Sequence, residues 1–447
     1  MSTQVLPTTI EERAGRRFSP EEIFRITSAR EQALSRLLVA YIVAGVAFML
    51  LPGTFLGVWN LLAISGRQAA ESISATWIQA HGQAQVFGWI GSFILGIGFY
   101  SVPKLRRAEP VALAPGWIAW GLWTSGVLLR WTSNIYLWEW RLLLPLSAAL
   151  QLSAFLIFAK AVSSHRPADE SEVLDTWVRL VMGATVGLFL ALVMNLAAGV
   201  YLALLGESPA LPHVFNQRYL VFIAWGFLVP FVWGFSARWL PVFLGLRPVR
   251  EKWLRRAFVI NSAGVVSALF GWIHIATALL FLATLLVTFA VRLWEASRQP
   301  AKTRGVHPTF PLFVRSAYVW LVMAGALGVW AAQLDHAAGI WGASRHALTV
   351  GFVSMMVFSI GQRVLPAFAG MKLLFSTRIM FLSTATLTIG CLLRVSSEVL
   401  AYQNYAGWAW KVLPISAITE MAAVSFFALN LLMTLSKPGT GELAKKR

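Results

Sequence analysis

Long apolar segments recur throughout this chain, and they constrain its fold more than any other feature. A run of about 18 apolar residues forms a helix long enough to cross the roughly 30 Å hydrocarbon core of a bilayer. A hydrophobic content of 57% with only 13% charged residues fits the same class. We therefore expect an all-α integral membrane protein embedded in a lipid bilayer. Twelve spans are predicted, at residues 37–58, 79–101, 112–130, 142–162, 177–204, 219–244, 256–272, 275–291, 312–332, 346–369, 379–396 and 413–435.

The spans at 256–272 and 275–291 are the hardest to separate, since only Ile273 and His274 lie between them. Merging them would leave eleven spans and would move the C-terminus to the other side of the membrane. Basic residues discriminate between the two counts, because cytoplasmic loops are enriched in Lys and Arg. With twelve spans and both termini cytoplasmic, 28 of the 37 basic residues fall on the inner side and six on the outer side. The charge distribution therefore favours twelve spans.

The net charge of +18 is then mostly a signal of topology. Attraction of basic loops to the anionic inner leaflet accounts for it, so no nucleic-acid partner is implied. Residues 1–36 are predicted to form a cytoplasmic segment with a surface helix over 20–36, opened by Ser19 as N-cap with a proline and two glutamates behind it. Residues 37–435 are predicted to form the membrane domain, and residues 436–447 a basic cytoplasmic tail.

One pattern occurs three times: a glycine followed by an aromatic residue, with an aliphatic-proline pair that ends fifteen residues after the glycine. We call it the Gly-Pro frame, and its copies run over residues 88–103, 226–241 and 351–366. They fall in the second, sixth and tenth spans, which predicts three pseudo-repeats of a four-helix unit. The proline would end or kink each helix at its inner end, and the glycine would let a ring or a neighbouring helix approach.

Two histidines precede the glycines of the first and third frames, His81 by seven residues and His346 by five. Both spans start on the outer side, so the two imidazoles are expected at one depth. An ionisable side chain within a span is costly and is usually functional or well paired, and neutral imidazole is a common ligand of haem iron. His81 and His346 are therefore candidate ligands on opposite faces of one haem. The alternative is a pair of packing histidines bonded to carbonyl groups.

Other residues in the outer half would complete such a site. Gly88 and Gly351 lie one to two turns below the histidines and could leave room for the macrocycle. Arg345, together with Arg130 or Arg141, could pair with the haem propionates.

Two further residues mark what the pattern leaves open. The middle frame has Tyr219 seven residues before its glycine, where the first frame has His81, so three scaffold positions hold two candidate ligands. Glu420 lies about two turns into the last span. It is either part of a proton relay or a hydrogen-bonded structural carboxylate.

Three windows, one in each frame-bearing span, resemble the NnrS family of haem- and copper-containing membrane proteins. The resemblance covers all twelve spans in layout and is specific in these windows. They are Ala80-His81-Gly82-Gln83 through Phe87-Gly88, then Gly234 with Arg238-Trp239-Leu240-Pro241 and Phe243, and finally His346-Ala-Leu-Thr-Val-Gly351 with Met355, Met356 and Arg363. The resemblance implies a bacterial inner-membrane protein whose scaffold is similar to the catalytic subunit of haem-copper oxidases, where the second and tenth spans carry haem ligands.

This resemblance supports haem b at His81 and His346. Where the family pattern has a second histidine and a glutamate, this chain has Gln83 and Ala84. The sixth span contains no histidine, so the copper site of the oxidases is not carried over.

Copper therefore stays open. The one cysteine, Cys391, offers neither a disulfide framework nor a thiolate cluster, so any metal needs histidine or carboxylate ligands. His274 falls near the place where such oxidases hold copper ligands, but one imidazole does not define a copper site. His336 is a second outer-side candidate, and Asp335 beside it could orient its ring or form a solvated loop pair with it.

The function that the resemblance implies is tolerance of nitric oxide or nitrosative stress, by binding or converting a diatomic gas or by exchanging electrons with a redox partner. Two imidazoles on one iron leave no open position for a gas, which favours electron transfer unless one ligand is labile or a second haem is bound. Whether the protein is an enzyme stays open, and no catalytic residue is predicted. The alternative is a haem-free transporter or assembly factor built on the same bundle.

Overall fold

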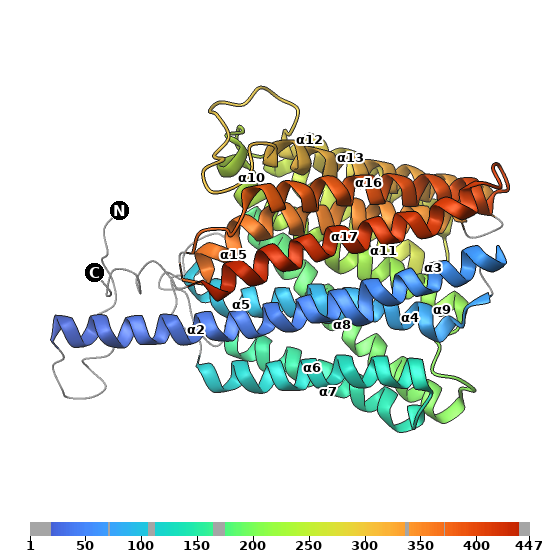
Figure 1. The fold of residues 1–447 in the computed structure, drawn as a ribbon, viewed down its shortest axis with the longest axis horizontal. Helices are drawn as coiled ribbons and strands as arrows, with labels where there is room; N and C mark the ends of the chain where they lie inside the picture. The colour runs from blue at the N-terminus through green and yellow to red at the C-terminus, as the bar shows by residue number, and fades with distance from the viewer. Residues whose placement is uncertain are drawn as a thin grey trace.

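The computed structural model of the protein describes residues 19–69, 72–105, 112–163, 175–335, 339–370 and 372–437. Within these ranges the chain is helical and contains no β-strand, which confirms the predicted all-α class. Its helices run side by side along the long axis of the molecule (Figure 1). The helices are α2 (Pro20–Phe48), η1 (Met49–Phe55), α3 (Leu56–Arg67), α4 (Ala75–Gln83), η3 (Ala84–Gly91), α5 (Ser92–Leu105), α6 (Leu113–Tyr136), α7 (Trp140–Ser163), α8 (Thr176–Leu205), α9 (His213–Val221), η4 (Phe222–Leu228), α10 (Val229–Leu244), α11 (Glu251–Leu269), α12 (Ile273–Val291), α13 (Phe310–Leu334), α14 (Gly339–His346), η5 (Ala347–Ser354), η6 (Val357–Gly361), α15 (Gln362–Phe368), α16 (Thr377–Tyr402) and α17 (Ala409–Ser436), where η marks a π-helical segment.

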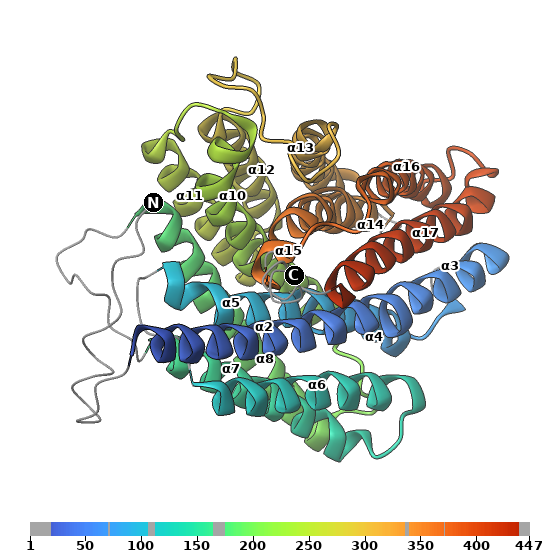
Figure 2. The same ribbon diagram turned by 60° about the vertical axis from the view of Figure 1, so that its left-hand side comes forward.

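Ten helical segments in the described ranges are long and apolar enough to cross a membrane. Helices α6 and α11 fall outside that set, because α6 is rich in tryptophan, glycine and small polar residues, and α11 begins with a charged turn. Both pack lengthwise against an apolar neighbour, α6 against α7 and α11 against α12. Figure 2 shows the two pairs on different sides of the bundle. Crossing by α6 and α11, on which the count of twelve spans depends, stays a prediction.

The first helix starts where the sequence predicts and ends much later. Ser19 caps α2, with its hydroxyl accepting from the Glu22 amide and the Glu22 carboxylate accepting from the Ser19 amide. The helix then continues through η1 and α3 to Arg67 without a break. A separate surface helix over residues 20–36 is therefore not formed, since no helix-breaking residue separates this polar stretch from the apolar one. Figure 1 shows the start of α2 projecting beyond the bundle.

The chain turns back between α11 and α12, where the sequence left a single long segment open as an alternative. Gly271 adopts a φ of +85°, a left-handed conformation that glycine reaches without steric cost. The two helices are therefore separate and antiparallel, and His274 lies in the first turn of α12. The start of α2 and the end of α17 lie at the same end of the bundle (Figure 1).

The glycine of each Gly-Pro frame lies in a π-helical segment, namely η3, η4 and η5. Such segments add a residue to a turn and often occur at functional sites. The frame prolines stand near the far ends of α5, α10 and α15. A methyl group built at Gly88 would lie 2.8 Å from Cβ of Phe48, and one at Gly351 would lie 2.5 Å from Cγ of Trp320. These two glycines thus permit close helix packing, and a part in enclosing a haem stays a prediction.

Candidate functional site

His81 packs against the first long helix, which runs without a break over α2, η1 and α3. Its Nδ1 lies 2.8 Å from the carbonyl oxygen of Gly53 in η1, so the ring donates a hydrogen bond there. A methyl group built at Gly57 would lie 2.7 Å from Cε1 of the imidazole, so the absence of a side chain at Gly57 makes room for the ring. Nε2 has no hydrogen bond to any residue in the described ranges. This arrangement fixes the tautomer and leaves the Nε2 lone pair free.

His346, the last residue of α14, is held in a similar way. Its Nδ1 donates to the carbonyl oxygen of Gly342, 2.9 Å away. Oε2 of Glu398 lies 3.1 Å from the same nitrogen. The contact places a buried carboxylate directly beside the ring. Nε2 of His346 again has no hydrogen-bond partner among the described residues.

The carboxylate beside His346 belongs to a buried ion pair on α16. Arg394 Nε lies 3.3 Å from Oε2 of Glu398, and its Nη2 lies 3.4 Å from Oε1. The two residues are 7% and 5% exposed. A methyl group built at Gly342 would lie 2.0 Å from Oε1 of Glu398, so this glycine is what lets the carboxylate approach α14.

Sequence reasoning missed this pair. The predicted span ended at residue 396, which placed Glu398 outside the membrane helix, whereas α16 continues to Tyr402. The signal was present: an arginine and a glutamate four residues apart in an apolar helix lie on one face and can pair.

The structure brings four helices together at the two histidines. His81 and His346 lie close enough to interact electrostatically, and Arg394 interacts with His81 as well. Glu420 on α17 interacts with both His346 and Arg394, and its side chain packs against Gly390 of α16. Counted from the starts of α4 and α14, the two histidines stand about 9 Å and about 10 Å along their helices. The candidate site therefore draws on α4, α14, α16 and α17.

The three arginines predicted to pair with propionates lie in different places. Nη1 of Arg345 donates to the Gln217 side chain at 3.1 Å, and Arg345 interacts electrostatically with Glu398. Arg141 is bonded to the carbonyl groups at the end of α8 and in the loop that follows, at 3.1 and 3.0 Å. Arg130 is buried on α6 and is described below. Only Arg345 is thus placed beside the histidine cluster.

The remaining metal candidates are spread out. Nδ1 of His274 lies 3.4 Å from the Gln333 side chain, on an exposed surface. The carboxylate of Asp335 accepts from the Trp341 amide and from the Gln403 side chain, and His336 lies outside the described residues. In the part of the chain that the structure describes, no group of three or more His, Cys, Asp or Glu side chains is placed to hold a metal ion.

The histidine cluster fits a haem iron by the chemistry of its donors. Ligating histidines usually donate their second ring nitrogen to a carbonyl or a carboxylate, which fixes the ring and raises its basicity. Both Nδ1 atoms are used in this way, and both Nε2 atoms are free to ligate. Nη1 of Arg394 and Oε1 of Glu420 are buried without hydrogen-bond partners in the described ranges. Polar groups in that state have unused capacity for a bound group.

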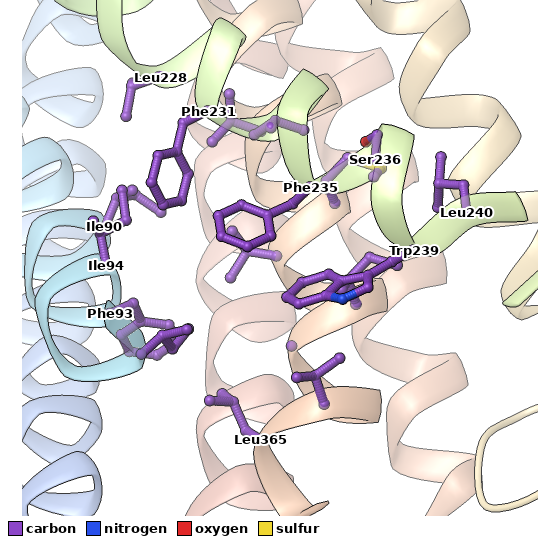
Figure 3. A pocket seen from close by; sticks show the side chains of 18 residues that line it. Ile90, Phe93, Ile94, Leu228, Phe231, Phe235, Ser236, Trp239, Leu240 and Leu365 are labelled. Atoms are coloured by element: carbon purple, nitrogen blue, oxygen red, sulfur yellow. The ribbon is translucent and has the colours of Figure 1, made fainter. Parts of the chain in front are cut away.

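An apolar cavity of about 120 Å³ lies between the three frame-bearing helices. Its walls come from the residues between the glycine and the proline of every frame. Phe93, Phe235 and Trp239 point into it, and Ser236 supplies its one hydroxyl group (Figure 3). A cavity with this lining suits a small neutral guest rather than an ion.

Comparison with known proteins fits this arrangement. A heme-copper terminal oxidase, solved as a dimer by cryo-electron microscopy, is similar with a TM-score of 0.71 and 14% identity over 91% of this chain and 85% of that chain. At this identity the likeness concerns the fold alone, and it confirms the predicted oxidase-like scaffold. No curated protein sequence matches the chain. The sequence profile described as "NnrS protein" matches residues 27–438, and the chain therefore belongs to the NnrS family.

Proposed function

We propose that the protein binds one b-type haem between His81 and His346. The observation that carries this proposal is the pair of imidazoles, each with Nδ1 bonded to a backbone carbonyl and Nε2 free. The similarity of the fold to a heme-copper terminal oxidase supports it. When bound, the haem would supply reversible one-electron chemistry at its iron.

The residues around His346 would tune that site. The carboxylate of Glu398 places negative charge beside Nδ1, which increases the electron density that the imidazole can donate. Arg394 balances the carboxylate, so that the pair can be buried without a net charge. Arg345 and the unpaired Nη1 of Arg394 are the cations placed to meet carboxylate groups of a ligand.

Two histidine ligands leave the iron without an open position, and this favours membrane electron transfer over gas chemistry at that iron. We propose that this electron transfer serves tolerance of nitric oxide or nitrosative stress. Membership of the NnrS family supports that role. The apolar cavity between the frames would accept a neutral diatomic gas in the bilayer interior, and its lining supports such a gas as the second partner.

We further propose that α6 and α11 cross the membrane together with the ten apolar segments, which gives twelve spans in three four-helix units. The start of α2 and the end of α17 lie at one end of the bundle. Positive charge on the loops at that end would then place the N- and C-termini in the cytoplasm. The inner membrane of a bacterium is the expected location.

The test is optical and redox spectroscopy of the purified protein. We expect a Soret band and the sharp α and β bands of a low-spin haem on reduction. His81→Ala and His346→Ala should each remove the low-spin spectrum. His213→Ala is the matched control, since this histidine lies on an exposed turn beside Gln217 and should leave the spectrum unchanged.

A purified protein without Soret absorption would overturn the haem proposal and favour the haem-free transporter or assembly factor. If both histidine variants kept the low-spin spectrum, the haem would have to be bound elsewhere.

A further inference from the structure

A second buried polar cluster lies away from the two histidines, around Arg130. The residue is 1% exposed, and none of its three guanidinium nitrogens has a hydrogen-bond partner among the described residues. No ion pair involves it in those ranges. Arg130 stands six residues before the end of α6, about 9 Å along the helix axis.

The packing of α6 fixes the position of this arginine. One turn after it, Asn134 donates to the carbonyl oxygen of Thr76 on α4, at 3.3 Å. One turn before it, Gly126 lets α7 come close, because a methyl group there would lie 2.8 Å from Cγ of Gln151. Arg130 is thus held between α4 and α7.

The group that interacts with the guanidinium is a neutral phenol. Tyr219, which occupies the histidine position of the middle frame, interacts electrostatically with Arg130, and the Gln83 side chain lies against its hydroxyl. The Tyr219 hydroxyl donates to the Ala191 carbonyl over a long 3.3 Å, one turn from Asn195. Both side-chain amide atoms of Gln151 and of Asn195 are fully buried and lack partners in the described ranges.

The cluster is separate from the histidine site. On an α-helix, residues two apart point in nearly opposite directions, since each residue turns the helix by about 100°. His81 faces Gly53 in η1, and Gln83 faces Tyr219 on α9. Arg130 therefore lies on the opposite side of α4 from the His81 ring.

We propose that Arg130 binds a small inorganic monoanion, a halide or a planar oxyanion such as nitrite or nitrate. A buried guanidinium without a counter-charge is costly in a membrane interior, and the described residues supply no carboxylate to it. One buried cation beside a neutral phenol balances one negative charge. Bidentate guanidinium geometry suits a planar oxyanion. Gln83, which lies against the Tyr219 hydroxyl, and Gln151, which packs against Gly126 one turn from Arg130, carry the nearby side-chain amides.

The experiment uses the full-length protein in detergent and measures thermal unfolding by tryptophan fluorescence. Sodium nitrite, nitrate or chloride replaces sodium gluconate at constant ionic strength, because gluconate is too large for a space between packed helices. We expect a saturable rise in Tm with at least one of the small anions. Arg130→Gln should remove the response. Arg141→Gln is the matched control, since that arginine is exposed and bonded to carbonyl groups, and it should respond like the wild type.

A second variant covers the case in which Arg130→Gln does not fold. Tyr219→Phe keeps the ring and removes a hydroxyl that can turn towards the anion. The anion concentration at half-maximal response should rise by about tenfold, the value of one hydrogen bond to a charged group.

A propionate group of bound haem is the alternative to a free inorganic anion as the partner of this guanidinium. His81→Ala and His346→Ala, which lose the proposed haem, should keep the anion response. If a propionate held Arg130, the wild type would show no anion response and the two histidine variants would gain one, and this pattern would overturn the free-anion site. An equal Tm in all salts for the wild type would overturn it as well, without bearing on the haem proposal.

Discussion

Single residues decide how the candidate ligands are held. His81 and His346 are held in the same way: Nδ1 donates a hydrogen bond to a helix carbonyl oxygen, and Nε2 stays free. They differ in their surroundings, since within the described ranges only His346 has a buried carboxylate beside it. Glu398 therefore makes the two faces of the proposed haem chemically unequal.

Glu398→Gln tests this at the residue scale. The change removes one negative charge next to the ligand imidazole, so the oxidised iron loses stabilisation and the midpoint potential should rise. A spectroelectrochemical titration of the purified protein measures the shift.

Glu295→Gln is the control for that titration. Arg292, which hydrogen-bonds to Glu295, holds the pKa of this carboxyl below its usual range, so the control also removes a negative charge. The residue lies beyond the end of α12, away from the histidines, and its replacement should leave the potential unchanged. Equal shifts in both variants would mean that the effect is not local to His346.

At the scale of elements, the frame-bearing helices combine close packing with locally widened turns. The π-helical segments η3, η4 and η5 each contain a frame glycine. Helix α8 approaches the middle segment so closely that a methyl group built at Gly187 would lie 2.2 Å from the carbonyl oxygen of Gly226. A backbone atom cannot move aside as a flexible side chain can, so this contact is rigid.

Gly187→Ala should therefore destabilise the protein by about 1–3 kcal/mol through overpacking. Thermal unfolding in detergent measures the effect. The matched control is Gly121→Ala on α6, where nothing lies within 4 Å of the new methyl group. That variant should be neutral or gain about 0.5–1 kcal/mol, because alanine loses less entropy in a helix. A Gly187→Ala variant as stable as the control would show that η4 can shift away from α8.

At the scale of the whole molecule, the number of crossings fixes which loops share a side. With α11 as a span, six crossings separate the loop holding Glu207 from the loop holding Asn404, so both loops lie on one side. Three crossings separate Glu207 from Lys302, which places Lys302 on the other side. Without α11 as a span, Glu207 and Asn404 would lie on opposite sides.

Cysteine labelling tests this count in a Cys391→Ser background, which removes the one natural thiol. A membrane-impermeant maleimide applied to intact spheroplasts should label Glu207→Cys and Asn404→Cys. Lys302→Cys should react only after lysis. Labelling of Glu207→Cys without Asn404→Cys in intact cells would rule out α11 as a crossing helix.

The sequence by itself determined the membrane class, most helix positions and the family, and it singled out the two histidines whose part as ligands stays a prediction. Hydropathy and helix length depend on local composition, and the frame and its histidines are local patterns. The turn at Gly271 is predictable for the same reason, since it needs only one glycine between two apolar stretches.

Only the tertiary structure showed which side chains meet. The pairing of His346 with Glu398, the closeness of Gly342 that permits it, and the isolation of Arg130 from the carboxylates of the described residues depend on contacts between helices far apart in sequence. Helix packing angles and rotations set these contacts, and they are not encoded in any one segment. For that reason the sequence grouped Arg130 with Arg345, whereas packing places Arg130 in a separate cluster with Tyr219.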